Sequence, residues 1–362
     1  MKNKDLLSTV FFLSLGFLCM GFCSNNIRCT IGNYNNRAEN FEHNRQLKSW
    51  SVELSDKRII NFLMSTEVKI YLDDLFQILK ENSIYRNNID WNFIQSELYL
   101  NASGAFFIFQ AQKSVLNAFN NLGDNHSYLV NEDFQKQENE NIKKQLNKNI
   151  EYGFINKNTV YIKLPPASSS SFLYADKLQK IIKQLSKKKP LYWVLDLRGN
   201  SGGNIWEMLL GLSPLLGDGT YGYFGNGEND FLAWTYNKGK LSLKNDDTNH
   251  LITFVKKPFL LKKSPKKIAL LIDEKTASSA EAVVIAFKSK ENVITFGSKT
   301  CGAATATTSF KLQSGSTLFL AVSYFFDCNK INYPNGIYPD VNLSNSTSEA
   351  DFLASVNNFF EQ

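Results

Sequence analysis

A short run of small residues, Thr276–Glu281 (TASSAE), constrains this chain more than any other stretch. It follows an apolar run, Ile268–Ile272, and precedes a segment of helical character, Ala282–Phe287. A buried strand is therefore expected to end where a helix begins. Ser278 would present its hydroxyl at a helix N-terminus, where free N–H groups and the positive end of the helix dipole favour a developing anion. This place suits a nucleophilic serine if a base lies within hydrogen-bond reach.

The same residues also have a purely structural interpretation. Ser278 and Glu281 stand three residues apart, like the serine and glutamate of a capping box at positions N-cap and N3 of a helix. The two interpretations are compatible, because a nucleophile can lie in the first turn of a capped helix. The rest of the chain has to decide between them.

The segments around this stretch alternate between strands and helices. Strands are predicted at Val160–Leu164, Leu191–Leu195 and Val293–Phe296, and an amphipathic helix is predicted at Phe172–Ser186. This order indicates an α/β domain with a largely parallel sheet, which we place at residues 150–345. Residues 217–250 are rich in Gly, Asn and Asp; we expect them to leave the sheet, as a candidate wall of a substrate cleft.

A helical domain is predicted before the α/β domain, at residues 49–130, and a C-terminal helix is predicted within residues 346–362. The apolar residues of the first region recur with the period of an amphipathic helix. Three helices are predicted there, at Val68–Lys80, at Trp91–Leu100 with Asp90 as its N-cap, and at Ser114–Leu122.

The N-terminus has the pattern of an export signal. Two lysines precede an uncharged apolar stretch, Leu6–Phe22, so we interpret residues 1–23 as a signal peptide. A membrane anchor is the alternative, although the stretch is short for a bilayer span. Cys23 is a candidate for lipid modification, and residues 24–48 are expected to form a flexible lead-in. The predicted location is therefore the periplasm or the cell surface.

The charge of the chain gives no reason to expect nucleic acid as a partner. The net charge is +6 over 362 residues. The lysine runs Lys187–Lys189 and Lys262–Lys267 directly precede apolar strands, and we interpret them as solvated loops. A membrane contact is expected only through a lipid anchor at Cys23. No cysteine or histidine spacing resembles a zinc site, and no cofactor or metal is implied.

Two of the five cysteines are predicted to face each other in a hairpin. Strands at Thr305–Leu312 and Thr317–Phe326 would flank a turn whose midpoint is also the midpoint between Cys301 and Cys328. If that register continues, the two side chains lie close enough for a disulfide. An exported protein would permit one.

Two further stretches carry candidate chemistry. The predicted strand at Leu191–Leu195 runs into Asp196–Gly203 (DLRGNSGG), and glycines at such a turn bring backbone N–H groups close to a ligand. The spacing of a phosphate-binding loop is absent, so an oxyanion hole is the favoured interpretation. His126 lies in a tight Gly-Asp-Asn turn after a predicted helix, where it is either an ordinary loop histidine or a base.

Four stretches now stand in order: Leu122–His126 (LGDNH), Asp196–Gly203, Thr276–Glu281 and Gly336–Asp340 (GIYPD). In this order they resemble the tail-specific (C-terminal-processing) serine peptidases, a family that includes the tricorn protease core. The resemblance extends from about residue 68 to about residue 343.

The resemblance implies a crotonase-like α/β catalytic core preceded by a helical domain. It implies that Ser278 is the nucleophile. The amide of Ser279 and amides of the Gly202-Gly203 turn would form the oxyanion hole. Glu281 matches a family position that has a supporting catalytic role.

The chain departs from the commoner members of that family. Many use a lysine base 25 residues after the serine, and Ala303 stands there, whereas Lys299 matches a different family position. The interval from Ser127 to Glu151 is too short for the peptide-binding PDZ domain that those members carry.

The resemblance is closer to the tricorn-like branch, which takes a histidine base from the segment that matches His126. A neutral imidazole can accept the serine proton near neutral pH. The glutamate of that branch is replaced by Tyr333, so the third, orienting role falls to Glu281 or Asp124, or is unfilled.

These patterns predict an exported serine endopeptidase that hydrolyses peptides or unfolded proteins. Ser278 would form an acyl-enzyme, with His126 as general base and then general acid. The alternative is a catalytically inactive peptide- or lipophile-binding module on the same fold, since a fold does not by itself fix a function.

Overall fold

A computed structural model describes residues 64–124, 126–130, 150–167, 173–227, 230–343 and 349–361. These residues form two compact units. One, called here the helical unit, contains the described residues up to 130 together with Phe310–Leu320. The other, called the α/β unit, contains the remainder. The predicted signal peptide, the lead-in, Cys23 and residues 131–149 lie outside the described residues.

The helical unit contains the three predicted helices. They are α4 (Thr66–Asn82), α5 (Trp91–Asn101) and α6 (Gln112–Leu122), joined through single turns of 3-10 helix, η3 (Arg86–Asn88) and η4 (Ile108–Ala111). Asp90 caps α5 as predicted, because its carboxylate accepts hydrogen bonds from the N–H groups of Asn92 and Phe93. The helical periodicity of the sequence is thereby confirmed.

A small β-structure completes the helical unit. Strand β1 (Tyr128–Val130) pairs antiparallel with residues 317–319 at the beginning of β12 (Thr317–Phe326). This part of the predicted hairpin therefore packs with the helical unit, although the sequence suggested that it belongs to the α/β domain.

The α/β unit is built on a six-stranded sheet in the order β13-β10-β9-β4-β3-β2. All neighbours are parallel except β2 and β3. The prediction of a largely parallel sheet is confirmed. Its strands are β2 (Glu151–Phe154), β3 (Thr159–Lys163), β4 (Tyr192–Asp196), β9 (Lys267–Ile272), β10 (Val293–Gly297) and β13 (Val341–Asn342).

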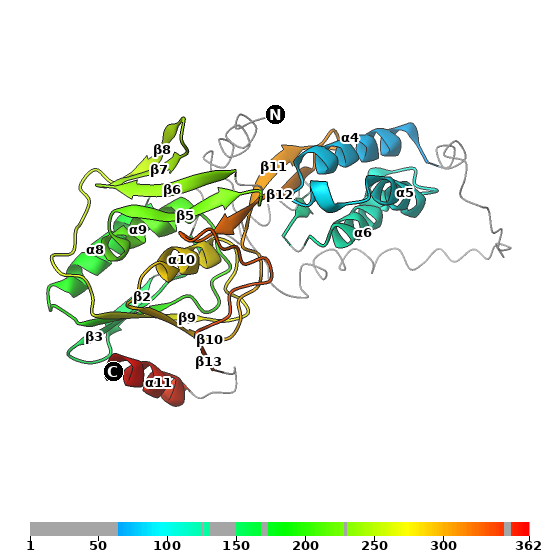
Figure 1. Cartoon of the computed structure of the whole chain (residues 1–362). Helices are drawn as coiled ribbons and strands as arrows, with labels where there is room; N and C mark the ends of the chain where they lie inside the picture. Colours follow the sequence, from blue (N-terminus) through cyan, green and yellow to red (C-terminus); the bar gives the residue numbers. More distant parts are fainter. Residues whose placement is uncertain are drawn as a thin grey trace. The chain divides into compact units, whose positions relative to one another are not determined.

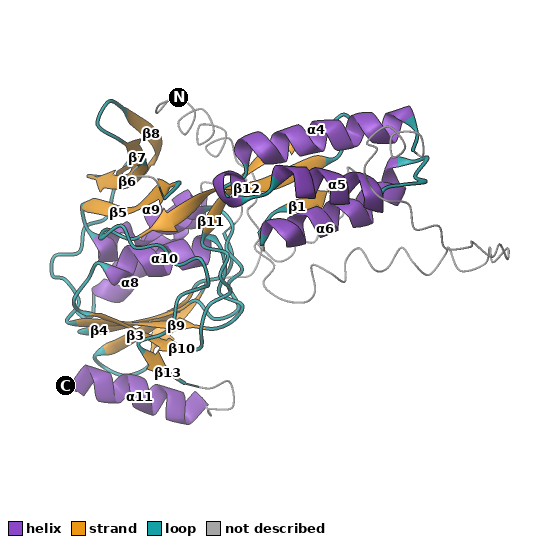
Figure 2. Ribbon diagram, turned by 45° about the vertical axis from the view of Figure 1, so that its right-hand side comes forward, coloured by secondary structure: helices purple, strands orange, loops and turns teal. Residues whose placement is uncertain are grey.

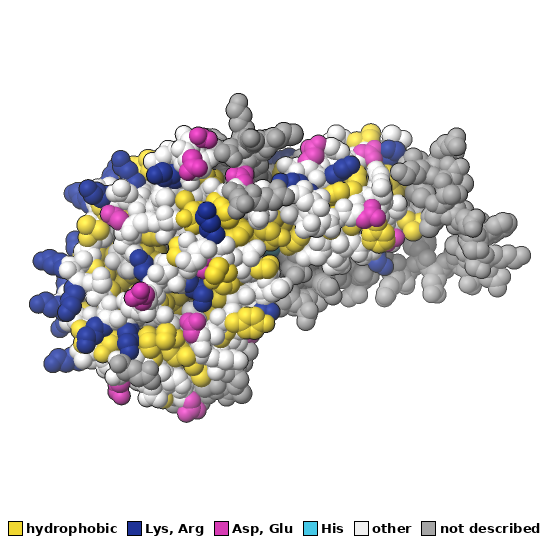
Figure 3. Space-filling view, in the orientation of Figure 1, with side chains coloured by type: hydrophobic (Ala, Val, Ile, Leu, Met, Phe, Trp, Pro, Cys, Tyr) yellow, Lys and Arg dark blue, Asp and Glu magenta, His cyan; other side chains and the backbone are white. Residues whose placement is uncertain are grey.

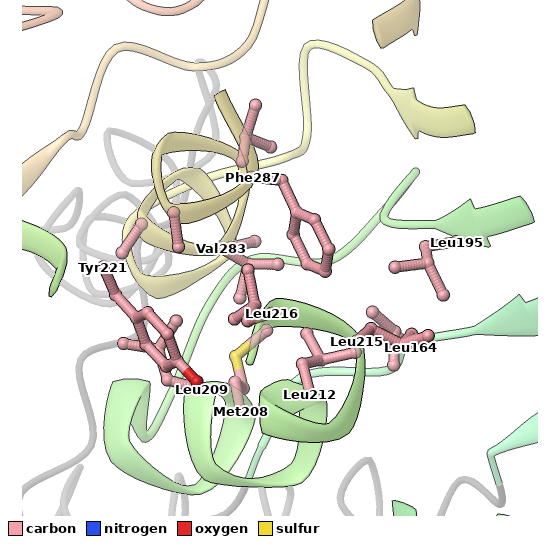
Figure 4. Packing of buried hydrophobic residues seen from close by; sticks show 14 of the residues in the cluster. Leu164, Leu195, Met208, Leu209, Leu212, Leu215, Leu216, Tyr221, Val283 and Phe287 are labelled. Carbon is pink, nitrogen blue, oxygen red and sulfur yellow. The ribbon is translucent and has the colours of Figure 1, made fainter. Parts of the chain in front are cut away.

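Helices cover both faces of this sheet (Figures 1 and 2). On one face lie α8 (Leu173–Ser186), α9 (Ile205–Leu216) and α10 (Ser279–Lys288), and on the other lies α11 (Glu349–Glu361). Successive side chains of a strand point to opposite faces. Trp193 and Leu195 therefore join the core under α9 and α10, whereas Val194 packs with the α11 residue Phe352. Figure 4 shows the first of these cores.

A second sheet covers the outer side of α9 and α10 (Figure 2). Strands β5 (Gly219–Gly225), β6 (Phe231–Asn237), β7 (Lys240–Lys244) and β8 (Asn249–Phe254) form it in antiparallel order, and the end of β12 joins its β5 edge. The sequence predicted no strands at residues 217–250. Buried residues alternate with less buried ones along β6, and this two-residue period was hidden among turn-forming Gly, Asn and Asp.

The predicted disulfide between Cys301 and Cys328 is wrong, because Cys328 carries a free thiol. Phe325 N–H donates to Ala304 O (2.9 Å), so the expected register holds near that end of β11 (Thr305–Lys311) and β12. The ladder stops short of the cysteines. Cys301 N–H is directed to Thr276 O (3.0 Å), and the chain after β12 bends into a turn at Asp327.

Within the described ranges, no helix has the length and apolar character needed to span a bilayer.

Candidate active site

The candidate residues of the α/β unit gather at the carboxyl edge of the parallel sheet, where open α/β sheets commonly bind ligands. The segments that leave β4, β9 and β10 are tied together at this edge. Leu197 N–H donates to Leu271 O (2.8 Å), and Ser298 N–H donates to Ile272 O (3.2 Å). The turn into α9 and the turn into α10 therefore lie side by side.

Ser278 is the N-cap of α10, as the sequence predicted, and its backbone is strained. Its φ of 54° and ψ of −121° belong to a region that residues with a Cβ rarely adopt. Such a conformation costs about 1–3 kcal/mol and persists only where the surroundings enforce it, commonly at functional sites. The Ser278 side chain is fully buried, and its hydroxyl has no hydrogen-bond partner within the described residues.

The Glu281 carboxylate is what enforces this turn. It is fully buried, and four hydrogen bonds from described residues reach it. Oε2 accepts from Ser278 N–H (2.9 Å) and Ala303 N–H (2.9 Å), and Oε1 accepts from Thr300 Oγ1 (2.6 Å) and Gly302 N–H (3.0 Å). One carboxylate thus joins the strained serine to the segment after β10.

The GIYPD stretch is connected to the same carboxylate through Thr300. Ile337 N–H donates to Thr300 Oγ1 (2.7 Å), so the single hydroxyl proton of Thr300 is directed to Glu281. Asp340 anchors the end of the stretch, because its Oδ2 accepts from both N–H and Oγ1 of Thr295 on β10. Gly336–Asp340 therefore connects Thr300, and through it Glu281, to β10.

Two glycines bring the backbone of the other turn against Ser278. Gly202 has φ of 105°, and a Cβ there would lie 2.9 Å from Ala277 O and 3.0 Å from Ser278 Cβ. Gly203 has φ of 115°, and a Cβ there would lie 2.0 Å from Ala167 O. Glycine is required at both positions by conformation and by space.

Of the three amides predicted to form an oxyanion hole, one is occupied. Gly202 N–H donates to Asn200 Oδ1 (2.8 Å). The N–H groups of Gly203 and Ser279 have no acceptor within the described part of the chain. Ser279 Oγ donates to Gly203 O (2.7 Å), which holds these two backbones together.

Asn200 is a residue of the site that the sequence analysis missed. It is 1% exposed. Its side-chain Nδ2 donates to Leu164 O (2.8 Å), and its backbone carbonyl accepts from Ala277 N–H (3.0 Å). With the hydrogen bond from Gly202 N–H, it links the residue after β3, the glycine turn and the residue before Ser278. The sequence offered one signal for this role: a side-chain amide, which can donate and accept hydrogen bonds at once, stands between glycines of a predicted turn.

His126 lies in the helical unit, just beyond α6. The helix ends at Gly123, which has a left-handed φ of 69°. Asp124 Oδ1 then accepts from the N–H groups of His126 (2.9 Å) and Ser127 (2.8 Å), and its Oδ2 accepts from the Ser127 hydroxyl. His126 itself is 4% exposed. Asp124 therefore fixes the backbone that carries the histidine.

The comparisons with known proteins decide the family. Residues 158–343 match the model described as peptidase family S41. The chain belongs to this family. It is a serine-type peptidase of the tail-specific group, and the resemblance drawn from its four motifs is confirmed.

Three relatives show how far the similarity extends. The nisin-resistance protein of Lactococcus lactis subsp. lactis is 30% identical over 229 residues, which are 63% of this chain and 68% of that protein. The carboxy-terminal processing protease CtpA of Bacillus subtilis (strain 168) is 28% identical over 175 residues, 48% of this chain but only 33% of that protease. Among solved structures, a lipoprotein from Streptococcus agalactiae has the same fold, with a TM-score of 0.64 and 21% identity over 81% of this chain and 96% of that one.

The positions at which this S41 peptidase departs from the commoner family pattern have other roles. Ala303, where a lysine base would stand, donates its N–H to Glu281 Oε2 (2.9 Å). Lys299 lies over the ring of Tyr338, with 5.1 Å from Nζ to the ring centroid. The Tyr333 hydroxyl donates to Asp327 Oδ2 (2.8 Å); burial and this acceptor raise the pKa of Tyr333.

The residues described contain no group of three or more His, Cys, Asp and Glu side chains that could hold a metal ion.

Proposed function

We propose that this S41 peptidase is an exported endopeptidase in which Ser278 is the nucleophile and His126 the general base. The observation that carries the proposal is the state of Ser278. Its buried hydroxyl, on a strained backbone, has no partner among the described residues, and the neighbouring amides of Gly203 and Ser279 have no acceptor there either. Backbone strain is common at active sites, and N–H donors beside the nucleophile stabilise the oxyanion of acyl transfer.

The proposed reaction follows from these groups. Neutral His126 takes the Ser278 proton as Oγ attacks the peptide carbonyl, and the oxyanion is held by the amides of Gly203 and Ser279 at the positive end of α10. When the C–N bond breaks, the imidazolium returns the proton to the leaving amine. Water activated by the same imidazole then hydrolyses the acyl-enzyme.

Glu281 supports the reaction by holding the Ser278 turn in place. Its two oxygens already accept four hydrogen bonds from the turn and from the segment after β10. We therefore assign it a positioning role. Asp124 has the corresponding role for the backbone of His126.

We further propose that the α/β unit is a crotonase-like catalytic core, with the helical unit as its N-terminal domain. Peptides are the proposed substrate class. Nisin is the first peptide to test, because the match to the nisin-resistance protein covers 68% of that relative. A structural neighbour is a lipoprotein, which supports export and lipid attachment at Cys23.

The test is labelling of the purified protein with a fluorophosphonate probe, which modifies activated serines. Wild type should be labelled, and Ser278→Ala and His126→Ala should not. Ser289→Ala and His250→Ala, at a serine and a histidine outside the proposed machinery, are matched controls and should be labelled like wild type. Folded wild-type protein that resists the probe, or a His126→Ala variant labelled at the wild-type rate, would contradict the mechanism. Absence of labelling would favour a binding module.

A further inference from the structure

Two segments of the α/β unit carry only positive charge. Residues 177–195 and 249–272 together contain twelve lysines and no Asp, Glu or Arg. The whole chain has 40 basic and 34 acidic residues, so the rest of the chain has 28 basic residues against the same 34 acidic ones. The net charge of +6 therefore hides a strongly basic part and an acidic remainder. The lysines are Lys177, Lys180, Lys183, Lys187, Lys188, Lys189, Lys256, Lys257, Lys262, Lys263, Lys266 and Lys267.

The fold brings these two segments together. Lys266 N–H donates to Leu191 O (2.8 Å), and Phe259 N–H donates to Gln179 Oε1 (3.2 Å). The segment between β8 and β9 therefore runs along α8 and the loop after it. All twelve lysines are exposed except Lys267, whose ammonium donates to Phe359 O (2.6 Å). Figure 3 shows Lys and Arg side chains gathered along the left-hand edge of the α/β unit.

The second of these segments also carries exposed apolar side chains. Leu260, between Lys257 and Lys262 in the chain, is 58% exposed, and Leu251 and Phe254 on the β8 edge are 52% and 53% exposed. Single exposed leucines are ordinary on protein surfaces. Exposed lysines followed and preceded in the chain by exposed leucine and phenylalanine are, however, a combination that binds bilayer surfaces, because the cations attract lipid phosphates and the apolar groups enter the acyl boundary.

The position of the lysines relative to the candidate active site is also informative. Lys187–Lys189 precede β4 and Lys262–Lys266 precede β9, so they lie at the amino edge of the parallel sheet. Ser278 and the glycine turn lie at the carboxyl edge. A flat anionic surface against these lysines would leave the catalytic edge facing away from it.

We propose that these eleven exposed lysines, with Leu260, form a surface that binds the headgroups of an anionic lipid bilayer. The surface is called here the basic surface. The proposal does not depend on the reaction at Ser278, because the basic surface includes no residue of the candidate site. It holds the peptidase on a membrane with its catalytic edge directed toward the peptides in the surrounding medium.

The test is co-sedimentation of the full chain with vesicles of phosphatidylcholine, alone or mixed with phosphatidylglycerol. The neutral vesicles account for any insertion by other apolar segments. We expect binding that requires phosphatidylglycerol and weakens as salt screens the charges.

Removing three lysines should weaken vesicle binding about 100-fold, given the contribution of each lysine near a charged bilayer. The variant is Lys187→Gln, Lys188→Gln and Lys263→Gln, and the matched control in the helical unit is Lys80→Gln, Lys113→Gln and Lys311→Gln.

Two further measurements decide what the basic surface recognises. Leu260→Ser should weaken vesicle binding and leave binding of soluble polyphosphate unchanged, because only a bilayer offers an apolar layer. Wild type that binds polyphosphate but not the anionic vesicles would show a site for soluble polyanions and overturn the membrane proposal. Equal vesicle binding by the lysine variant and its control would overturn it as well.

Discussion

Replacing Glu281 by Gln tests whether the carboxylate holds the nucleophile turn. Glutamine has the same shape but supplies one acceptor oxygen, and each Glu281 oxygen now accepts two hydrogen bonds. Either orientation of the amide therefore leaves two of the four donors facing an NH2 group. A buried donor without an acceptor costs about 1–3 kcal/mol, so we expect a loss of roughly 2–6 kcal/mol in the free energy of unfolding. Domains of this kind are stable by about 5–15 kcal/mol, so the variant should fold but be clearly weakened.

The assay combines urea unfolding with the rate of fluorophosphonate labelling. Labelling of Glu281→Gln should slow in urea-free buffer, where the protein is still folded, because Ser278 N–H or its neighbours lose their fixed partner. Glu274→Gln is the matched control, since that exposed carboxylate accepts from the Ser298 hydroxyl (3.2 Å) and should tolerate the change. An unfolding free energy of Glu281→Gln within about 0.5 kcal/mol of wild type would refute the reasoning.

Two other substitutions have outcomes that depend on pH. The fluorophosphonate labelling rate of Asn200→Asp should be low at neutral pH and should rise relative to the wild-type rate as pH falls. Only a protonated carboxyl can donate to Leu164 O while it accepts from Gly202 N–H. A ratio of the two labelling rates that stays constant with pH would contradict this role of Asn200. Burial raises the pKa of Glu207, against the opposing hydrogen bond from Ala175 N–H, so the folded state holds the proton more tightly than the unfolded chain. The unfolding free energy should therefore fall as pH rises from the ordinary glutamate pKa to the raised one, and Glu207→Gln should lack this fall in urea unfolding followed across that range.

The sequence alone was enough for the family and for the local structure around Ser278. Strand-to-helix turns are local events, so the apolar run before Thr276 and the helical pattern after Glu281 predicted β9, α10 and the N-cap serine correctly. The same holds for the three helices of the helical unit, whose apolar period is visible within each segment.

The sequence could not show which donors satisfy which acceptors between distant segments. The occupation of the Gly202 amide by Asn200, and the joining of Thr300 to Glu281, depend on loops that only the assembled sheet brings to one edge. The predicted partner of Cys301 was wrong as well, because Cys301 is disulfide-bonded whereas Cys328 carries a free thiol. Hydrogen bonds to Glu281 and Thr276 pull the chain around Cys301 out of the hairpin ladder.

Charge gives the clearest division between what sequence and tertiary structure determine. The sequence determined that lysines precede two strands, and within each run they resemble solvated loops. Only the packing of the segment before β9 along α8 placed the runs on one face. Electrostatic potential adds through space and not along the chain, so the basic surface exists only in the folded protein.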